Sequence, residues 1–155
     1  MICHGDYDPE VKEYFLEFEN SKAELLKIHS SKLRTILKNE DLSSIKLVFV
    51  NACHSEEVAK IFLEFGVRCV IVIQGKHKIN DAYARAFSNF LYEGIIEGES
   101  IKEAFNSAIF QLEAFYMNED DSCCCGHSHK EDCQWVAHRR LKGGENAHFA
   151  HESYC

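Results

Sequence analysis

Three short hydrophobic runs stand out along the chain and mark its strands. Residues 13–18 are rich in aromatic side chains, and residues 45–50 (IKLVFV) form a nearly unbroken apolar run. Residues 67–73 (VRCVIVI) are continuous and rich in β-branched side chains. Unbroken apolar runs of this length suit strands that are covered on both faces, as in parallel sheets. We therefore predict a strand over 13–18 and central parallel strands over 45–50 and 67–73.

The segments between these predicted strands carry apolar residues at helical spacing. A helix over 33–37 follows Ser30, which can cap its N-terminus. A second helix begins after Ser55, another capping residue, and ends at Gly66 in a left-handed conformation. Strands and helices therefore alternate along the chain, which indicates an α/β fold.

Two further helices carry a longer apolar stripe. Residues 81–93 place apolar side chains at helical spacing, and we expect Gly94 to end this helix. Ser100 and Glu103 form a capping box at the start of the next helix, whose stripe continues to residue 116. We expect the apolar face of each helix to be buried, and both helices fit the α/β fold.

Composition and charge argue against several classes of function. The net charge of -8 and the pI near 5.6 disfavour binding to nucleic acid or to anionic membranes, because both would repel the chain. No apolar run approaches the roughly 20 residues that span a bilayer. The chain opens without a basic and apolar leader, and five of its eight cysteines lie after Asp121. We therefore expect a reduced, cytoplasmic protein.

Two reactive side chains fall where predicted strands end. His4 follows a short apolar segment, and Cys53 follows the strand at 45–50. The carboxyl ends of parallel strands share one edge of a sheet, where an imidazole can activate a thiol and the N–H of Gly5 can reach an oxyanion. The alternative is structural, since free cysteine usually packs as a small hydrophobe and a lone histidine beside glycine is commonly a surface residue. His54 follows Cys53 directly and is expected to point elsewhere.

The order of these motifs resembles that of the caspase-like (clan CD) cysteine peptidases. One apolar strand ends in His4-Gly5, and a second ends in Asn51-Ala52-Cys53. The elements that follow are similar to the CHAT family: a helix after the cysteine, an apolar strand, a polar loop and a helix with the pattern AFSNFLYEGIIEGESIKEA. The similarity spans residues 2–112.

The resemblance implies both a fold and a chemistry. The fold is a caspase-like three-layer sandwich with a mostly parallel central sheet, of which this chain holds the C-terminal half. The chemistry is peptide-bond hydrolysis without a cofactor, with Cys53 as nucleophile and His4 as general base and acid. The N–H groups of Gly5 and Cys53 would form the oxyanion hole. The loop at 74–80 would line the cleft for a protein or peptide substrate.

Two features depart from the family pattern. No strand precedes the one that ends in His4-Gly5, so we expect the chain to be a fragment of a longer product. The loop at 74–80 lacks the tryptophan often found there in the family. The alternative to a peptidase is therefore a non-catalytic interaction or scaffold module that contacts other domains of a longer chain.

The apolar period disappears past residue 117, and Cys and His then crowd the sequence. We place a domain boundary there, between an α/β domain over 1–117 and a tail over 118–155. The tail offers soft ligands at the close spacing that tetrahedral Zn²⁺ accepts: Cys123, Cys125, His127, His129 and Cys133. Such a zinc site would be structural, and a third hypothesis makes the chain a zinc-binding adaptor. The alternative is a tail whose cysteines are incidental.

Overall fold

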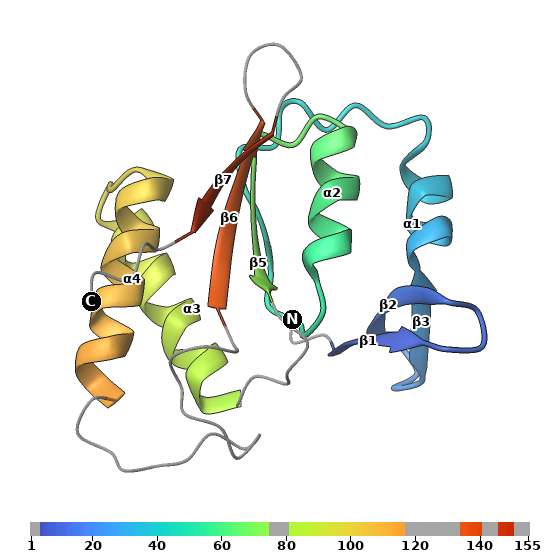
Figure 1. Cartoon of the computed structure of the whole chain (residues 1–155), viewed down its shortest axis with the longest axis horizontal. Helices are drawn as coiled ribbons and strands as arrows, with labels where there is room; N and C mark the ends of the chain where they lie inside the picture. The colour runs from blue at the N-terminus through green and yellow to red at the C-terminus, as the bar shows by residue number, and fades with distance from the viewer. Residues whose placement is uncertain (1–3, 75–80, 117–133, 141–145, 151–155) are drawn as a thin grey trace. The chain divides into compact units, whose positions relative to one another are not determined.

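The computed structural model describes residues 4–74, 81–116, 134–140 and 146–150 (Figure 1). In these ranges the chain is mixed α/β, with two small sheets and four helices. It divides into two compact units. The first unit holds both sheets and the first two helices, and the second holds the other two helices.

The first unit begins with a three-stranded antiparallel sheet in the order β1-β2-β3. Its strands are β1 (His4–Asp8), β2 (Glu13–Glu19) and β3 (Leu25–His29). The strand predicted over 13–18 is confirmed. The predicted place of His4, at the end of a strand of the parallel sheet, is wrong, because β1 runs onward from His4 and pairs antiparallel with β2.

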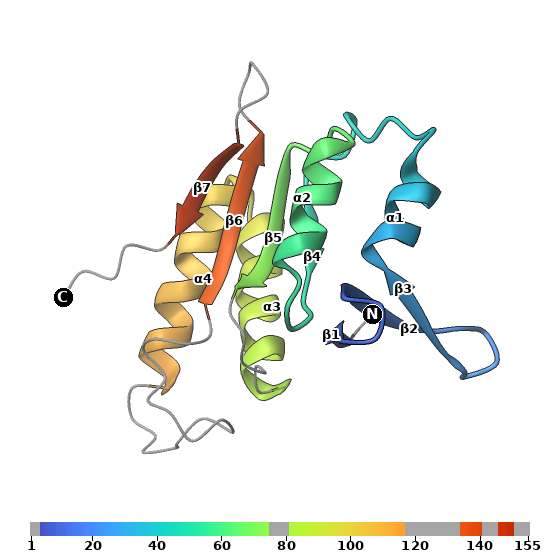
Figure 2. The ribbon, with the colours of Figure 1, turned by 45° about the vertical axis from the view of Figure 1, so that its right-hand side comes forward.

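The second sheet of this unit has the order β4-β5-β6-β7, and Figure 2 shows β5, β6 and β7 side by side. Only β4 (Val48–Val50) and β5 (Cys69–Gln74) pair in parallel. In the described strands this sheet is therefore mixed rather than mostly parallel. The run at 45–50 forms a strand only from Val48, because Ile45 turns back and donates its N–H to the carbonyl of Leu42.

The remaining strands of this sheet come from the part of the chain that we assigned to the tail. β6 (Gln134–Arg140) pairs antiparallel with β5, and β7 (Asn146–Ala150) pairs antiparallel with β6. His138 in β6 is buried. The predicted boundary after residue 117 falls outside the described residues. Those residues of the tail that the structure describes as strands extend this sheet.

Two helices belong to the first unit. α1 (Ser30–Leu37) is linked to α2 (Glu56–Glu64) by an ion pair between Arg34 and Glu64. Gly66 follows α2 with a positive φ of 105°, as predicted for a left-handed end. The predicted serine caps are wrong, because neither helix has a side-chain cap hydrogen bond.

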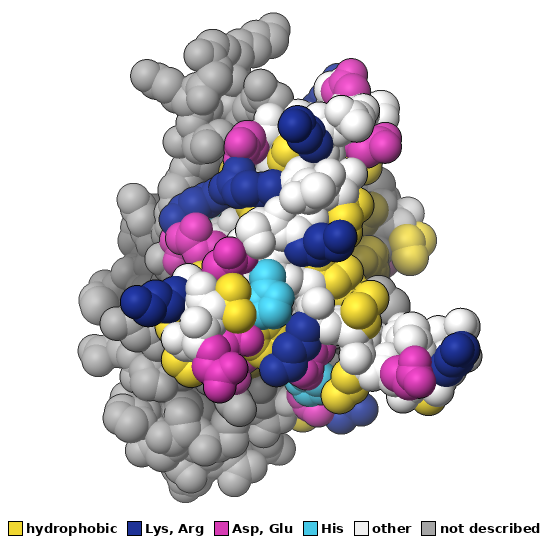
Figure 3. Space-filling view, turned by 90° about the vertical axis from the view of Figure 1, so that its right-hand side faces the viewer, with side chains coloured by type: hydrophobic (Ala, Val, Ile, Leu, Met, Phe, Trp, Pro, Cys, Tyr) yellow, Lys and Arg dark blue, Asp and Glu magenta, His cyan; other side chains and the backbone are white. Residues whose placement is uncertain are grey.

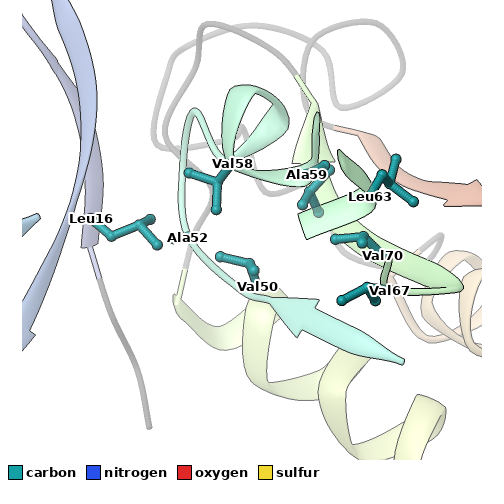
Figure 4. Close-up of a cluster of buried hydrophobic side chains, with 9 residues drawn as sticks. Leu16, Val50, Ala52, Val58, Ala59, Leu63, Val67 and Val70 are labelled. Carbon is teal, nitrogen blue, oxygen red and sulfur yellow. The ribbon is translucent and has the colours of Figure 1, made fainter. Parts of the chain in front are cut away.

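A hydrophobic core joins the two sheets of the first unit. Figure 4 shows Leu16 reaching from β2 toward Ala52 and Val58. Leu16 is also the register partner of Gly5 in β1. The buried members of this cluster come from β2, β4, α2, β5 and their connections: Leu16, Val50, Ala52, Val58, Ala59, Leu63, Val67, Val70 and Val72. Apolar burial of this kind is the main force that holds the antiparallel sheet in place.

The second unit is a pair of helices, α3 (Asp81–Ile96) and α4 (Ile101–Tyr116). The capping box is confirmed, because Ser100 and Glu103 each donate a backbone N–H to the other's side chain, at 2.9 and 3.3 Å. The predicted end of α3 at Gly94 is wrong. Gly94 lies inside the helix, where the absence of a side chain lets α3 approach Ala104 of α4.

Replacing Gly94 by alanine tests this helix contact. Alanine gains about 1 kcal/mol of helix propensity over glycine. The new Cβ would lie 3.1 Å from the Cβ of Ala104 and 3.2 Å from its Cα, and such overpacking costs about 1–3 kcal/mol. We expect a net loss of about 1 kcal/mol in the free energy of unfolding, measured in urea. Exposed Glu93, changed to alanine, is the control, and a more stable Gly94→Ala protein would contradict the contact.

Candidate active site

A close backbone contact joins the two sequence motifs. Gly5 is buried in β1, and a Cβ built on it would lie 2.1 Å from the carbonyl oxygen of Cys53. The same Cβ would lie 3.4 Å from the Cβ of Ala52. A carbon atom cannot sit 2.1 Å from a backbone oxygen, so only glycine fits here. The structure therefore brings the His4-Gly5 segment against the Asn51-Ala52-Cys53 segment.

Cys53 occupies the connection between β4 and α2. It is a reduced thiol with a half-buried side chain. The helix that follows begins at Glu56, and the N-terminus of a helix favours nearby negative charge. The first turn of the same helix carries Glu56 and Glu57, whose negative charges act against that of a thiolate.

Ser55 anchors the end of the same connection, directly before α2. Its side chain is fully buried, its hydroxyl donates to the carbonyl of Val50 at 3.4 Å, and it accepts the N–H of Ile73 at 3.1 Å. Ser55 therefore links the ends of β4 and β5. The expectation that it caps α2 is wrong. The sequence carries no signal for this role, because a serine before a helix usually acts as a cap.

His4 lies at the exposed start of β1, next to the contact between Gly5 and Cys53. It is exposed, and its register partner across the sheet is Glu17. Because side chains alternate along a strand, the imidazole leaves β1 on the face opposite the one by which Gly5 meets Cys53. The two motifs are adjacent, but a hydrogen bond between the imidazole of His4 and the thiol of Cys53 would require the ring to turn.

His54 makes contacts that the sequence did not indicate. Its backbone has a positive φ of 54°, and only 15% of its side chain is exposed. Its Nε2 lies 4.0 Å from Oδ1 of Asp6, and its ring stacks on Tyr14 with centroids 6.2 Å apart and an interplanar angle of 29°. His54 thus reaches from the Cys53 connection to both β1 and β2.

A second histidine–aspartate contact lies in the same antiparallel sheet. Nε2 of His29 is 3.1 Å from Oδ2 of Asp8, whose Oδ1 accepts the N–H groups of Glu10 and Val11. The hydrogen bond from His29 is the largest cause that holds the pKa of Asp8 below its ordinary value of 3.8, and the two backbone N–H groups add to it. The ring of His29 also packs against Phe15, at 5.7 Å between centroids.

The lowered pKa of Asp8 predicts a pH dependence. A carboxylate whose pKa is depressed on folding stabilises the protein above its unfolded pKa, and this contribution is lost as the pH falls from about 4 through the folded pKa. We expect Asp8→Asn to be less stable than the parent at pH 7 and to approach it below pH 4. Urea unfolding at pH 7, 5, 4 and 3 measures this. Glu10→Gln controls for the lost charge, and parallel curves for parent and Asp8→Asn would contradict the assignment.

Charge on the hairpin side of the molecule is mixed. Figure 3 shows Lys and Arg side chains interspersed with Asp and Glu, and hydrophobic side chains between them. Like and unlike charges in this arrangement largely cancel at a distance. The face shown therefore carries no broad field of a single sign that would attract a polyanion or a polycation.

Several predicted features lie outside the described residues. These are the candidate zinc ligands Cys123, Cys125, His127, His129 and Cys133, together with residues 75–80 of the loop predicted to line the cleft. Among the side chains that the structure describes, no three His, Cys, Asp or Glu residues are grouped to hold a metal ion. In the described helices, none is both long and apolar enough to cross a membrane.

No protein-family model and no curated protein matches this chain. The resemblance to the CHAT family stays a prediction that rests on the ordered motifs of the sequence.

Proposed function

We propose that this chain carries the catalytic centre of a caspase-like cysteine endopeptidase, with Cys53 as nucleophile and His4 as its acid–base partner. The contact between Gly5 and the carbonyl of Cys53 carries the proposal. It unites two motifs from distant parts of the chain at a half-buried thiol. A purely structural cysteine does not require a bare glycine backbone against it, whereas an oxyanion site needs backbone N–H groups close to the thiol.

The reaction follows from the chemistry of these groups. The imidazole of His4 takes the proton of the thiol, and the thiolate of Cys53 attacks the carbonyl carbon of a peptide. The carbonyl oxygen becomes an oxyanion that accepts N–H groups of Gly5 and Cys53. The C–N bond then breaks, His4 returns the proton to the leaving amine, and water hydrolyses the thioester to regenerate the thiol.

The exposed position of His4 sets one requirement on this mechanism. Catalytic hydrogen bonds are often long without substrate and tighten only in the substrate complex. The proposal therefore needs the ring of His4 to turn onto the thiol when a peptide binds. A place at the exposed start of β1 leaves the ring free of the core and able to make this movement.

Replacement of His4 by glutamine tests the acid–base assignment. Loss of a general base or acid is expected to lower kcat/KM by about 10²–10⁴-fold on a peptide that the parent cleaves. It should also shift the pH dependence of Cys53 alkylation, because the imidazole no longer promotes the thiolate. His29→Gln is the matched control in the same small sheet. Equal activity of the His4→Gln protein and the parent would rule out the dyad.

A second candidate function is a non-catalytic interaction module that retains the peptidase shell. The direction of the His4 side chain, away from the Gly5 contact, favours it. Its partners would be other domains of a longer chain. Peptide cleavage by the chain, or by one extended upstream of Met1, would exclude this candidate. Zinc in the tail remains a prediction, and metal analysis of the purified protein tests it.

A further inference from the structure

Three contacts hold the connection that bears Cys53. Gly5 of β1 lies against the carbonyl of Cys53 itself. The buried hydroxyl of Ser55 is bonded to β4 and β5. The third contact is the side chain of His54, which crosses to β1 and β2. The peptidase mechanism uses neither the ring of His54 nor its partners.

The backbone of His54 is in a conformation that needs compensation. A positive φ is uncommon for residues with a side chain, although His, Asn and Asp adopt it more readily than others. Lys12 and Ala23 adopt a similar φ at exposed positions, whereas His54 does so with a largely buried side chain. At His54 the surroundings are the carboxylate of Asp6 at 4.0 Å and the ring of Tyr14, and the side chain is 85% covered, because 15% of it is exposed.

The partners of His54 belong to the strands that present His4 and Gly5. Asp6 is the next residue but one after His4 in β1. Tyr14 lies in β2 and also contacts Tyr7 of β1 edge to face, with ring centroids 5.1 Å apart. A side chain adjacent to the nucleophile is thereby attached to the hairpin that carries the base and an oxyanion donor.

We propose that His54 is a positioning residue that locks the Cys53 connection against the β1–β2 hairpin through Asp6 and Tyr14. The inference rests on the proposed function in so far as the thiol it positions is the nucleophile. The lock maintains the separation of thiol and hairpin to within the small tolerance that bond formation allows. His54 neither accepts the proton of the thiol nor touches the substrate.

The test uses His54→Asn in the full chain. Asparagine accepts a positive φ as well as histidine does, so the variant removes the ring without adding backbone cost. The matched control is His29→Asn, which removes the other histidine that contacts an aspartate of β1. The readouts are hydrogen exchange of the amides of residues 52–55, site-resolved alkylation of Cys53 as a function of pH, and peptide hydrolysis.

We expect the His54→Asn protein to exchange the amides of residues 52–55 about 2- to 10-fold faster, the range set by loss of one aromatic stacking contact. Hydrolysis should fall by about 10- to 100-fold in kcat, as for a displaced catalytic group, with KM little changed. The pH midpoint of Cys53 alkylation should not move. Tyr14→Leu alone should also speed exchange at residues 52–55, because it removes the ring on which His54 stacks.

Unchanged exchange at residues 52–55 would overturn the proposal. So would a shifted alkylation midpoint with unchanged exchange, because that result would make His54 the base. An equal effect in His29→Asn would also overturn it, since the effect would then be general loss of stability. If the parent cleaves no peptide, the peptidase function fails, and faster exchange in His54→Asn alone still supports the positioning role.

Discussion

Replacing Cys53 by alanine is expected to abolish peptide hydrolysis, with a fall in kcat/KM of at least about 10⁴-fold. The variant has no atom that can form the thioester, so only the backbone N–H groups and substrate binding remain. Because Cys53 is only half-buried, the smaller side chain should leave stability nearly unchanged. Hydrolysis of a peptide by the parent and the variant, and labelling by a thiol-directed peptide electrophile, measure the effect.

Cys69 provides the matched control for this experiment. It is the other reduced thiol in the described part of the chain, and it lies in β5 rather than in the connection after β4. Cys69→Ala should keep both hydrolysis and labelling. If labelling survives Cys53→Ala and is lost in Cys69→Ala, or if cleavage is equal in the parent and Cys53→Ala, then Cys53 is not the nucleophile.

Gly5→Ala is expected to damage both the site and the fold. The new methyl carbon would lie 2.1 Å from the carbonyl oxygen of Cys53, and a backbone atom cannot move aside as a flexible side chain can. The chain must move β1 or the Cys53 connection, at a cost of about 1–3 kcal/mol in the free energy of unfolding. A displacement of about 1 Å at the thiol should lower kcat/KM by about 100-fold. Urea unfolding and peptide hydrolysis measure the two effects.

Gly98→Ala distinguishes this packing effect from a general intolerance of glycine substitution. No atom lies within 4 Å of a Cβ built on Gly98, but its φ of 95° strains any other residue. It belongs to the second compact unit. Gly98→Ala should therefore lose stability and keep the reactivity of Cys53. A Gly5→Ala protein with the stability and the thiol reactivity of the parent would show that β1 does not rest on the Cys53 connection.

Several elements with local signals could be predicted from the sequence, but the serine caps and the helix end at Gly94 show that a local signal alone does not suffice. The capping box at Ser100, the left-handed end at Gly66 and the strand β2 all follow from residues close to them in the chain. β3 was missed because its segment, LLKIH, does not alternate, and Leu25 and Leu26 remain exposed. β6 and β7 were missed because β6 pairs with β5, which lies some 60 residues or more away in the chain, and β7 pairs with β6.

Only some features of the candidate site could likewise be predicted from the sequence. The sequence indicated which residues to compare, because His4-Gly5 and Cys53 are short motifs with recognisable chemistry. It did not indicate that His4 lies in an antiparallel sheet, although the partner strand β2 follows β1 after a connection of only residues 9–12. Nor did it reveal the bridging role of Ser55 or the positive φ of His54, because both depend on space left by other elements.

The register of β1 and β2 has a consequence for how the protein tolerates change. Gly5 touches the Cys53 connection, and its partner directly across the ladder is Leu16, which is 3% exposed in the core. In this residue pair, Leu16 therefore packs in the core while Gly5 contacts Cys53. Leu16 carries no reactive group, yet its packing in the core helps to set how closely β1 lies against the Cys53 connection. A substitution at Leu16 that alters core packing is therefore also expected to move Gly5 relative to Cys53.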